Sequence, residues 1–305
     1  MKVIVTGGAG FIGRHVVDRF KDTGYDVQIW DNLSIGRYIK DDDEFHQLDV
    51  AYFDIDRAAK RVGDEEVIII HLAAQPRIQP SIVDTSTTHK SNVDGTYRML
   101  EFARKVNTKM FIYAGSSSVY GGGINNLESD DIHIKSPYSL SKYIGELYCR
   151  LYSSLYGIPS VVLRFFNVYG PGQIEDGDYA TVIGIFEKCY RENKPFPIVG
   201  SGLQRRDFTH IDDIADGIYM AATLEHSLVM GEVVNLGKGE NYSILEIANM
   251  FGGETEFIPQ RPGEYECTMA NHDRAKRFFG WYPQHNLIEY IEKIKINKGG
   301  SNGRK

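Results

Sequence analysis

The N-terminal region of the chain contains the stretch Thr6-Gly7-Gly8-Ala9-Gly10-Phe11-Ile12-Gly13, which joins a β-branched run to a helical pattern. Gly7, Gly10 and Gly13 are therefore spaced three residues apart at a strand-to-helix turn. Such a turn needs a residue without a Cβ for the bend, another where a pyrophosphate approaches the backbone, and a third for close helix–strand packing. The helix N-terminus then offers free N–H groups and a partial positive charge to phosphates. We predict that this turn binds a nucleotide.

Short apolar runs alternate with helical patterns over the first 170 residues. The runs typical of buried strands are Val3–Val5, Val27–Trp30, Val67–Ile70, Met110–Tyr113 and Pro159–Leu163. The helical patterns are Phe11–Lys21, Val93–Arg104 and Ser139–Tyr156. This alternation predicts an α/β fold with a doubly wound parallel sheet, the Rossmann arrangement.

The second half of the sequence is less regular. Pro171–Asp178 is typical of a loop, and three later segments have helical patterns, namely Thr181–Arg191, Ser243–Phe251 and Leu287–Ile294. We expect residues 1–170 to form the nucleotide-binding domain and residues 171–295 a smaller C-terminal α/β substrate lobe, with some crossing of the chain between them. The site is then expected outside the carboxyl ends of the strands, between the two parts. Residues 296–305 are expected to form a disordered tail.

The composition argues against several classes of protein. The 305 residues include 34 basic and 41 acidic side chains, and the net charge of -7 argues against nucleic-acid binding. The cysteines Cys149, Cys189 and Cys267 are odd in number and far apart, so we expect neither disulfides nor a metal site. No signal-peptide pattern and no apolar segment of about 20 residues occurs, so we expect a cytoplasmic protein that does not associate with membranes.

A carboxylate at the end of the second predicted strand identifies the nucleotide more closely. Asp31 follows the glycine turn by about 20 residues, the position from which a carboxylate accepts hydrogen bonds from ribose hydroxyls. The same carboxylate would repel a 2′-phosphate, so NAD is favoured over NADP. Arg37 in the following loop is the feature that would suit NADP instead.

Tyr138 and Lys142 lie four residues apart at the start of a predicted helix and therefore face the same side of it. A tyrosine that acts as a base must bring its pKa of about 10 down toward neutrality, and a lysine ammonium together with the positive nicotinamide stabilises the phenolate. Ser116 follows the predicted strand Met110–Tyr113, where its hydroxyl can bond a substrate hydroxyl and pass the proton to Tyr138. We predict that Ser116, Tyr138 and Lys142 are catalytic.

These features occur in order with several further motifs. The complete series is Thr6–Gly13, Asp31–Leu33, Leu48–Val50, His71–Gln75, Asn92–Thr96, Ser116–Gly121, Tyr138–Lys142, Arg164–Pro171, Arg206–Phe208 and Arg261–Glu264. Over roughly residues 1 to 295 the chain resembles the extended short-chain dehydrogenases/reductases, specifically the NAD-dependent nucleotide-sugar epimerase/dehydratase family and most closely its UDP-glucose 4-epimerase branch.

The resemblance implies roles for individual residues. NAD-binding residues would be Gly7, Gly10, Phe11, Ile12 and Gly13 in the turn, Asp31, Asn32, Leu33, Ser34 and Gly36 at the adenosine ribose, Asp49 and Val50 at the adenine, and Leu72, Ala73, Ala74, Gln75, Asn92 and Phe166 along the cofactor channel. Tyr138 would be the base, Lys142 would hold the nicotinamide ribose, and Ser116, rather than Ser117 or Ser118, would be the active-site hydroxyl. UDP-sugar-binding residues would be Ser116, Asn167, Arg206, Arg261 and Thr268. Arginine suits a diphosphate because its guanidinium pairs with phosphate oxygens in a bidentate manner.

The resemblance also narrows the reaction. Dehydratases of the family use an Asp-Glu pair directly after the catalytic hydroxyl, and the related decarboxylases use a Glu there, whereas this chain has Ser117 and Ser118. The remaining reaction is transient oxidation at C4, rotation of the keto sugar and return of the hydride to its other face. Thr268, at the position beside the sugar 2-substituent, is small enough that an N-acetylhexosamine would also fit.

Two alternatives remain at this stage. One is another nucleotide-sugar isomerase, dehydratase or reductase of the same family, for instance one that uses a GDP-sugar. The other is a catalytically silent NAD-binding regulator, which the presence of Tyr138, Lys142 and Ser116 disfavours. The resemblance further implies a homodimer, assembled through helices near Val93–Arg104 and Ser139–Tyr156.

Overall fold

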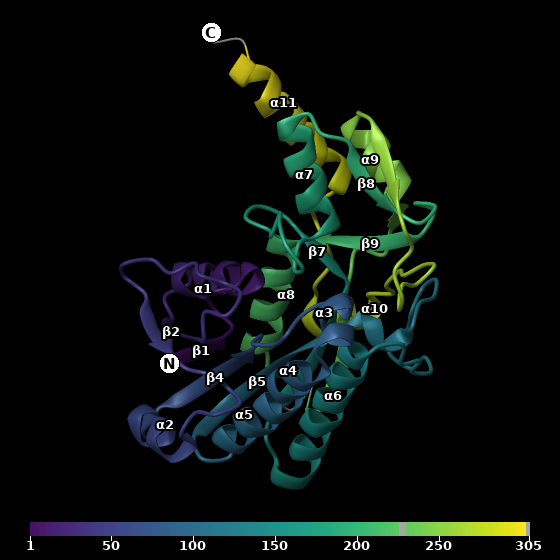
Figure 1. Cartoon of the computed structure of the whole chain (residues 1–305). Helices are drawn as coiled ribbons and strands as arrows, with labels where there is room; N and C mark the ends of the chain where they lie inside the picture. The colour runs from purple at the N-terminus through teal and green to yellow at the C-terminus, as the bar shows by residue number, and fades with distance from the viewer. Residues whose placement is uncertain (226–229, 303–305) are drawn as a thin grey trace.

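A seven-stranded parallel sheet forms the centre of the molecule (Figure 1). The computed structural model describes residues 1–225 and 230–302. The strands, in spatial order, are β10 (Glu232–Leu236), β6 (Ser160–Phe165), β5 (Asn107–Ser116), β4 (Glu66–His71), β1 (Lys2–Thr6), β2 (Asp26–Asp31) and β3 (Glu44–Gln47). The order reverses beside β1, which places the glycine turn at the switch point where ligands of such sheets bind.

The sheet is buried on both faces, because alternate residues of its strands enter two separate cores. Val3 and Val5 of β1 pack into one core, and Ile4 between them packs into the other. The first face is covered by α1 (Phe11–Asp22), α8 (Ile211–Thr223) and α10 (Asp273–Phe279). The second face is covered by α2 (Ile55–Val62), α5 (Gly95–Ala103) and α6 (Pro137–Tyr156). The predicted doubly wound α/β fold is therefore confirmed.

The chain crosses between its two halves more than once. After the smaller lobe has begun, α8 returns to pack beside α1, and β10 pairs with β6 in the main sheet. The sequence analysis did not identify β10, β3 or α2, because each is a short segment in which polar residues break the apolar pattern. Short connecting elements complete this half, namely α3 (Ile78–Val83), α4 (Thr85–His89), the π-helical turn η1 (Lys90–Asp94) and the 3-10 turn η2 (Ser117–Tyr120).

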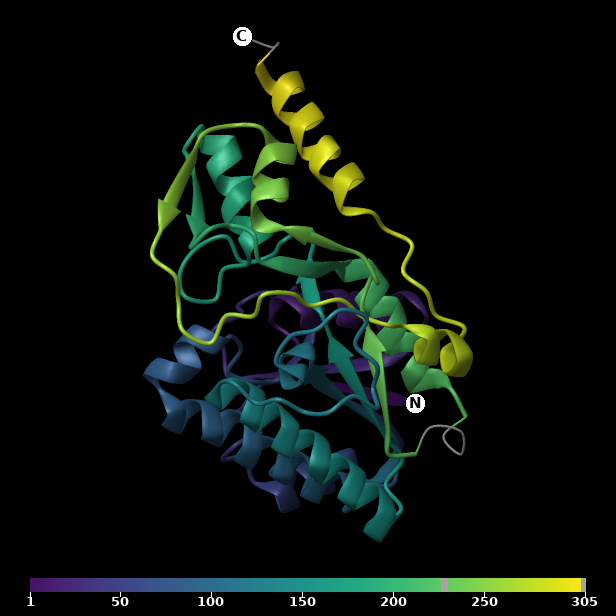
Figure 2. The same cartoon turned by 90° about the vertical axis from the view of Figure 1, so that its right-hand side faces the viewer.

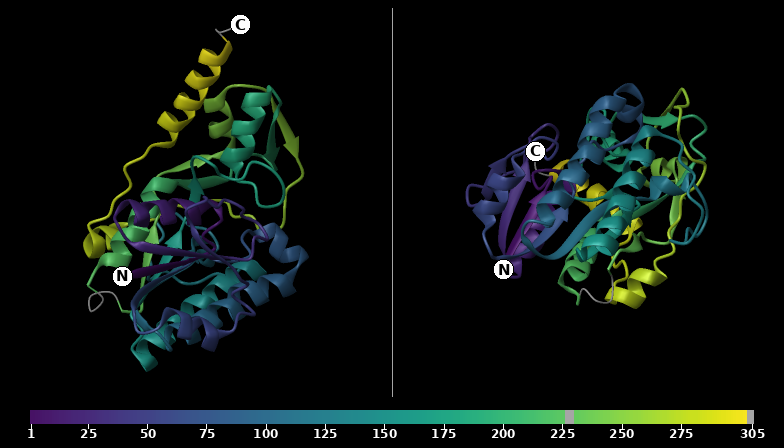
Figure 3. Two further views of the ribbon diagram at one scale, coloured as in Figure 1. Left: turned by 90° about the vertical axis from the view of Figure 1, so that its left-hand side faces the viewer. Right: turned by 90° about the horizontal axis from the view of Figure 1, so that it is seen from below.

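The second lobe has its own core. Its sheets combine β7 (Asn167–Tyr169), β9 (Arg205–His210) and β11 (Asn241–Ser243) in one group, and β8 (Phe196–Val199) and β12 (Thr255–Ile258) in another. Its helices are α7 (Val182–Glu192), α9 (Ile244–Phe251) and α11 (Leu287–Asn302). Figures 2 and 3 (left) show this lobe above the sheet, with α11 extending toward the C-terminus.

The C-terminal segment corrects one expectation. Helix α11 continues to Asn302, so residues 296–302 are not the disordered tail that the sequence analysis predicted. Lys298 anchors this part of the helix, because its ammonium donates a hydrogen bond to Asn193 Oδ1 at 2.6 Å and lies 4.3 Å from the ring centre of Tyr190. Residues 303–305 lie outside the described part of the chain.

Candidate functional site

One cavity of about 790 Å³ lies between the main sheet and the second lobe. Residues at the carboxyl ends of β1, β2, β4 and β5 line it, together with residues from α6 and the second lobe. Every site residue named from the sequence lines this cavity except Leu33 and Asn92. Residues more than 250 positions apart in the chain, such as Gly7 and Thr268, thus meet in one place.

The glycine turn has no room for side chains. Gly7 has a φ of +70°, and a Cβ on it would lie 2.7 Å from the backbone nitrogen of Ala73. A Cβ on Gly13 would lie 2.1 Å from the carbonyl oxygen of Gly7. Gly10 precedes α1 without a capping side chain, so the first N–H groups of this helix are left for an anion. The turn therefore fits the pyrophosphate of a dinucleotide.

Asp31 connects the end of β2 to this turn. Its carboxylate accepts hydrogen bonds from the backbone nitrogens of Ala9, at 3.1 Å, and Leu33, at 2.8 Å. Burial raises its pKa, and these backbone hydrogen bonds oppose the rise. The loop that follows packs closely on the turn, because a Cβ on Gly36 would lie 2.3 Å from the carbonyl oxygen of Ala9. Leu33, predicted to contact the cofactor, has a φ of +60° and donates its N–H to Asp31, and it is not among the residues that line the cavity.

A buried chain of hydrogen bonds supports the loop after β4. The Ala73 nitrogen donates to Thr6 Oγ1 at 3.2 Å, and Thr6 Oγ1 lies 2.7 Å from His71 Nδ1. His71 Nε2 lies 3.1 Å from Thr96 Oγ1, which donates to the carbonyl oxygen of Asn92 at 2.6 Å. Because Thr96 donates its hydroxyl proton to Asn92, His71 Nε2 must be the donor to Thr96. Burial lowers the pKa of His71 to about 3, so the ring is neutral and its Nδ1 accepts from Thr6. The imidazole therefore positions the strand ends and does not transfer protons near neutral pH.

Asn92, predicted to line the cofactor channel, lies behind the cavity wall in this structure. Its side chain is buried and is absent from the cavity lining. Its Oδ1 accepts from the Gln75 nitrogen at 2.7 Å, and its Nδ2 donates to the Gln75 carbonyl oxygen at 3.1 Å and to Ser141 Oγ at 2.9 Å. Asn92 thus holds Gln75, which does line the cavity, against the helix that carries Tyr138.

Ser116 and Tyr138 face each other from the end of β5 and the start of α6. Ser116 Oγ accepts the Ser118 N–H at 3.2 Å and caps η2, which fixes its position. Ser136 caps α6 with a reciprocal capping box, and Pro137 occupies the first turn, so Tyr138 is held in the first turn of the helix. Burial raises the pKa of Tyr138, whereas its hydrogen bond with Ser116 and the charge of Arg77 lower it.

Lys142 lies one helical turn after Tyr138 and is buried. Its ammonium donates a hydrogen bond to the carbonyl oxygen of Ala114 at 3.0 Å, and burial lowers its pKa to about 8. The helix can approach β5 this closely because Gly145 faces Tyr113, whose hydroxyl would lie 2.1 Å from a Cβ at that position. The structure thus places the ammonium at the same cavity as the Tyr138 hydroxyl.

Arg77 is a cavity residue that the sequence analysis missed. It adopts a φ of +80°, which is unusual for a residue other than glycine, and it precedes α3. Helix α3 is attached to the start of α6 by a hydrogen bond of 3.1 Å from the Tyr138 nitrogen to Ser81 Oγ. Arg77 Nε donates to the carbonyl oxygen of Tyr179 at 3.3 Å, and no carboxylate in the described ranges forms an ion pair with it. Sequence patterns do not reveal such a residue, because its backbone conformation is set by the surrounding loop.

Removing the positive charge of Arg77 is expected to change the pH dependence of turnover. A cation lowers the pKa of a nearby phenol, so Arg77→Gln raises the pKa of Tyr138. If Tyr138 is the base, as the sequence predicts, it must be deprotonated to act, so the acidic limb of the kcat/KM profile then moves to higher pH, and activity recovers as the pH rises. Rates measured from pH 6 to 10 test this prediction, with Arg77→Lys expected to keep the profile close to that of the wild type. A profile unchanged in Arg77→Gln would contradict it.

The second lobe contributes the residues predicted to hold the nucleotide sugar. Asn167, Arg206, Arg261 and Thr268 all line the cavity. The Arg206 guanidinium pairs with Glu264 Oε2 at 2.7 Å, while Arg261 is exposed at the cavity. The Thr268 hydroxyl is buried without a hydrogen-bond partner. An unpaired buried hydroxyl beside a cavity is suited to a polar ligand group.

Asp207 is a further residue whose function could not be inferred from its motif. Its buried carboxylate accepts backbone hydrogen bonds from Ala270 at 3.0 Å, Gly239 at 2.8 Å and Lys238 at 2.8 Å. Burial raises its pKa to about 6, and these hydrogen bonds oppose the rise. Asp207 therefore joins two loops behind β9 and positions the adjacent Arg206.

Comparison with known proteins agrees with this geometry. The model of the NAD dependent epimerase/dehydratase family matches residues 3–237. A relative from Methanocaldococcus jannaschii is 36% identical over 99% of both chains. The UDP-glucose 4-epimerase of Mycolicibacterium smegmatis is 32% identical, over 96% of this chain and 97% of its own length.

Solved structures are similar over the whole chain. The UDP-glucose 4-epimerase of Thermus thermophilus, in complex with NAD, has a TM-score of 0.87 and 28% identity, covering 99% of this chain and 100% of its own. The UDP-glucuronic acid 4-epimerase of Bacillus cereus, in complex with UDP-glucuronic acid and NAD, has a TM-score of 0.87 and 30% identity with the same coverage. Among the described residues, no helix is long and apolar enough to cross a membrane. The chain belongs to the NAD-dependent epimerase/dehydratase family, and its cofactor is NAD.

Proposed function

We propose that this chain catalyses the 4-epimerisation of a UDP-hexose, with UDP-glucose and UDP-galactose as its principal substrates. One observation carries the proposal: Ser116, Tyr138 and Lys142 line the same cavity as the glycine turn and the two arginines of the second lobe. A hydroxyl, a phenol and an ammonium suit the reversible oxidation of a secondary alcohol. The two arginines suit a diphosphate.

Each proposed role follows from the chemistry of its residue. Bound NAD⁺ supplies a hydride acceptor that returns the hydride, so that the reaction has no net redox change. Tyr138 takes the proton of the C4 hydroxyl, and Ser116 orients that hydroxyl through its own. The Lys142 ammonium favours the tyrosinate and holds the nicotinamide ribose. Arg206 and Arg261 bind the UDP group. Arg206 also forms an ion pair with Glu264.

The residues after Ser116 distinguish epimerisation from elimination. Ser117 and Ser118 line the cavity, and the Ser118 hydroxyl accepts a hydrogen bond from Ser116 at 2.9 Å. Neither side chain is a carboxylic acid, so neither can protonate a leaving hydroxyl in the way a dehydratase requires. The reaction is therefore expected to end with return of the hydride to the sugar.

A panel of nucleotide sugars tests the proposal. The purified protein is incubated with UDP-galactose, UDP-N-acetylglucosamine, UDP-glucuronate and a GDP-hexose, and the products are identified by chromatography and NMR. Conversion of UDP-galactose to UDP-glucose supports the proposal. Turnover of the GDP-hexose alone, a dehydrated product, or NAD binding without any turnover would refute it in favour of another family activity or a silent regulator.

The small side chain of Thr268 extends the proposal to N-acetylhexosamines. Thr268 lines the cavity, and its buried hydroxyl has no hydrogen-bond partner among the described residues. If the sugar 2-substituent lies beside it, as the family resemblance implies, an acetamido group has room and a hydrogen-bonding partner there. Turnover of UDP-glucose without any turnover of UDP-N-acetylglucosamine would remove this extension.

Arg77 favours a second candidate substrate, UDP-glucuronate. It is a cation in the cavity near Tyr138 without a carboxylate partner among the described residues. A hexuronate carboxylate would pair with such a guanidinium. The candidate predicts that Arg77→Gln raises KM for UDP-glucuronate about 100-fold, measured at the pH of maximal rate, while KM for UDP-galactose changes little. Equal effects on both substrates would exclude it.

We further propose that the chain forms a homodimer through α5 and α6. Leu140, Leu147, Leu151 and Leu155 of α6 are 43–62% exposed at intervals of seven, four and four residues, on a helix that is otherwise well packed. Tyr97 of α5 is exposed by 43% and lies 6.0 Å from the ring of Tyr148 of α6. A stripe of exposed leucines of this spacing is typical of a helix that packs against another helix.

Charge placed in this stripe is expected to separate the protomers. The double variant Leu147→Glu/Leu151→Glu buries two carboxylates without partners if the dimer forms, so we expect a monomer at micromolar concentration. Sedimentation or light scattering measures the mass. Leu203→Glu is the matched control, since Leu203 is 67% exposed in the second lobe and should leave the dimer intact. A dimer that survives the double variant would place the interface elsewhere.

A further inference from the structure

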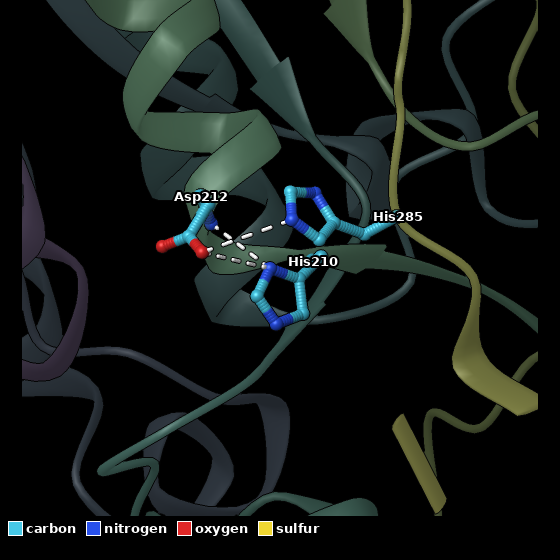
Figure 4. Close-up of side chains that lie close together, drawn as sticks. All are labelled: His210, Asp212 and His285. Atoms are coloured by element: carbon cyan, nitrogen blue, oxygen red, sulfur yellow. Dashed lines mark hydrogen bonds and ion pairs between the residues drawn. The ribbon is translucent and has the colours of Figure 1, made fainter. Parts of the chain in front are cut away.

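A second group of polar side chains lies outside the catalytic cavity, at the start of α8 (Figure 4). His210 ends β9, Asp212 lies in the first turn of α8, and His285 lies in the segment between α10 and α11. Their potential ligand atoms all lie within 4.8 Å of one another. None of the three lines the catalytic cavity.

Hydrogen bonds determine which nitrogen of each imidazole carries a lone pair. His285 Nδ1 lies 2.8 Å from Asp213 Oδ1, which can only accept, so the ring proton is at Nδ1 and Nε2 is free. That Nε2 faces Asp212 Oδ2 at 3.9 Å. His210 Nδ1 accepts the Asp212 N–H at 3.2 Å, so it too carries a lone pair, 3.6 Å from Asp212 Oδ2.

A third imidazole approaches the same carboxylate from α1. His15 Nε2 lies 3.0 Å from the carbonyl oxygen of Pro171 and donates its proton there. Its Nδ1 therefore directs a lone pair toward Asp212 Oδ1, at 3.7 Å. When the imidazoles are neutral, one carboxylate thus faces three nitrogen lone pairs.

A positive charge at the centre of this arrangement would be favourable, because acceptors that face one another without a donor repel. Protons on the imidazoles are one way to supply that charge. His210 and His285 stack with ring centres 4.3 Å apart, so a charge on both would be unfavourable. A metal cation satisfies all of these groups without a proton.

We propose that His210, Asp212 and His285 bind a divalent transition-metal ion of the zinc class. Imidazole nitrogen and carboxylate oxygen are ligands that Zn²⁺ accepts, with bonds of about 2.0 to 2.2 Å. The nitrogen-to-oxygen separations of 3.6 and 3.9 Å exceed the roughly 3.4 Å between two ligands of one tetrahedral ion by only a few tenths of an ångström. Asp213 orients His285 through its Nδ1 proton, as carboxylates commonly do behind a metal-bound histidine.

Binding requires two small local changes. The stacked rings of His210 and His285 must tilt from their interplanar angle of 20°, so that both lone pairs point to one ion. His210 must also exchange the Asp212 N–H for the metal. His285 is half-exposed in the segment before α11, so its ring is the one with room to tilt. His210 is buried against the rings of Tyr169 and Tyr290, so its position is already fixed by its neighbours.

The ion would have a structural role. It would cross-link the start of α8, which packs on the main sheet, to the segment that leads into α11 of the second lobe. His15 extends the contact to α1, directly behind the glycine turn. The spacing of the cysteines gave no reason to expect a metal site, and these three residues come from separate elements and show no spacing motif.

The test uses the full chain without a histidine tag, treated with EDTA and then dialysed. Titration with Zn²⁺ at pH 7.5 is expected to show one ion per chain with a micromolar Kd, and Co²⁺ in its place is expected to give the visible absorption of a low-coordinate nitrogen–oxygen site. Saturating Zn²⁺ is expected to raise Tm by several degrees. Epimerase turnover is expected to be unchanged when His285 or Asp212 is replaced, because neither residue lines the catalytic cavity.

Two variants and a control make the test decisive. His285→Ala and Asp212→Asn each remove one ligand at a half-exposed position and are expected to weaken Zn²⁺ binding at least 100-fold. His89→Ala is the control, since His89 Nε2 also lies 3.9 Å from a carboxylate, that of Asp94, but without a second imidazole. Absence of Zn²⁺ binding to the wild type below 1 mM, or equal binding by the wild type and both variants, would overturn the proposal.

Discussion

Replacing Tyr138 by phenylalanine is expected to lower kcat about 1000-fold, which is within the range for removal of a general base. The substitution removes one hydroxyl from a tyrosine in the first turn of α6 and leaves the capping box of Ser136 intact. Binding of NAD and of the UDP group uses other residues, so KM and NAD content are expected to change little. Initial rates with UDP-galactose, together with the NAD content of the purified protein, measure both effects.

The control for this variant is Tyr156→Phe. Tyr156 belongs to the same helix, is 48% exposed and is absent from the cavity lining. It therefore reports the general effect of removing a tyrosine hydroxyl from α6. If Tyr138→Phe retained more than a tenth of the wild-type kcat, Tyr138 could not be the base, and the proposed mechanism would have to be abandoned.

The substitution Gly13→Ala is expected to have the second large effect, on stability and on NAD binding together. The new Cβ would lie 2.1 Å from the carbonyl oxygen of Gly7 and 2.6 Å from Gly8 Cα, both backbone atoms that cannot rotate away. The first turn of α1 must therefore move away from β1. We expect a loss of about 2 to 3 kcal/mol in the free energy of unfolding and a protein purified without NAD. Chemical denaturation and nucleotide extraction measure these two quantities.

A glycine outside the site separates steric from conformational effects. Gly24 follows α1 with a φ of +84°, and a Cβ there would meet nothing within 4 Å. Gly24→Ala is thus expected to cost about 1 kcal/mol, from backbone conformation alone, with NAD content unchanged. Should Gly13→Ala bind NAD as the wild type does, the turn would not be where the pyrophosphate is held.

Local sequence patterns were sufficient to predict much of the fold. The strand-to-helix turn at Gly7–Gly13 could be inferred because its steric demands act between residues close in the chain. The strands of the sheet interior, such as β4, were evident because burial on both faces requires a continuous apolar run. Strands of mixed composition, such as β10, were not, since their place depends on pairing with a distant neighbour, β6.

For the site, the sequence determined the residue types, and the tertiary structure determined which of them lie together and which hydrogen bonds they form. Ser116, Tyr138 and Lys142 could be named from motifs, and the structure places them at one cavity. Leu33 and Asn92 were also assigned to the cofactor, and the structure adds that they hydrogen-bond Asp31 and Gln75, contacts that no local pattern reveals.

The features that only the tertiary structure decided all depend on distant contacts. The sequence by itself established an NAD-type turn, a parallel sheet and a Tyr–Lys pair, each defined by spacing within one or two elements. The uncompensated charge of Arg77, the neutral His71 behind the cofactor loop and the three imidazoles around Asp212 involve elements far apart in the chain. Charge, burial and hydrogen-bond direction are properties of a residue's neighbours, and folding brings those neighbours together.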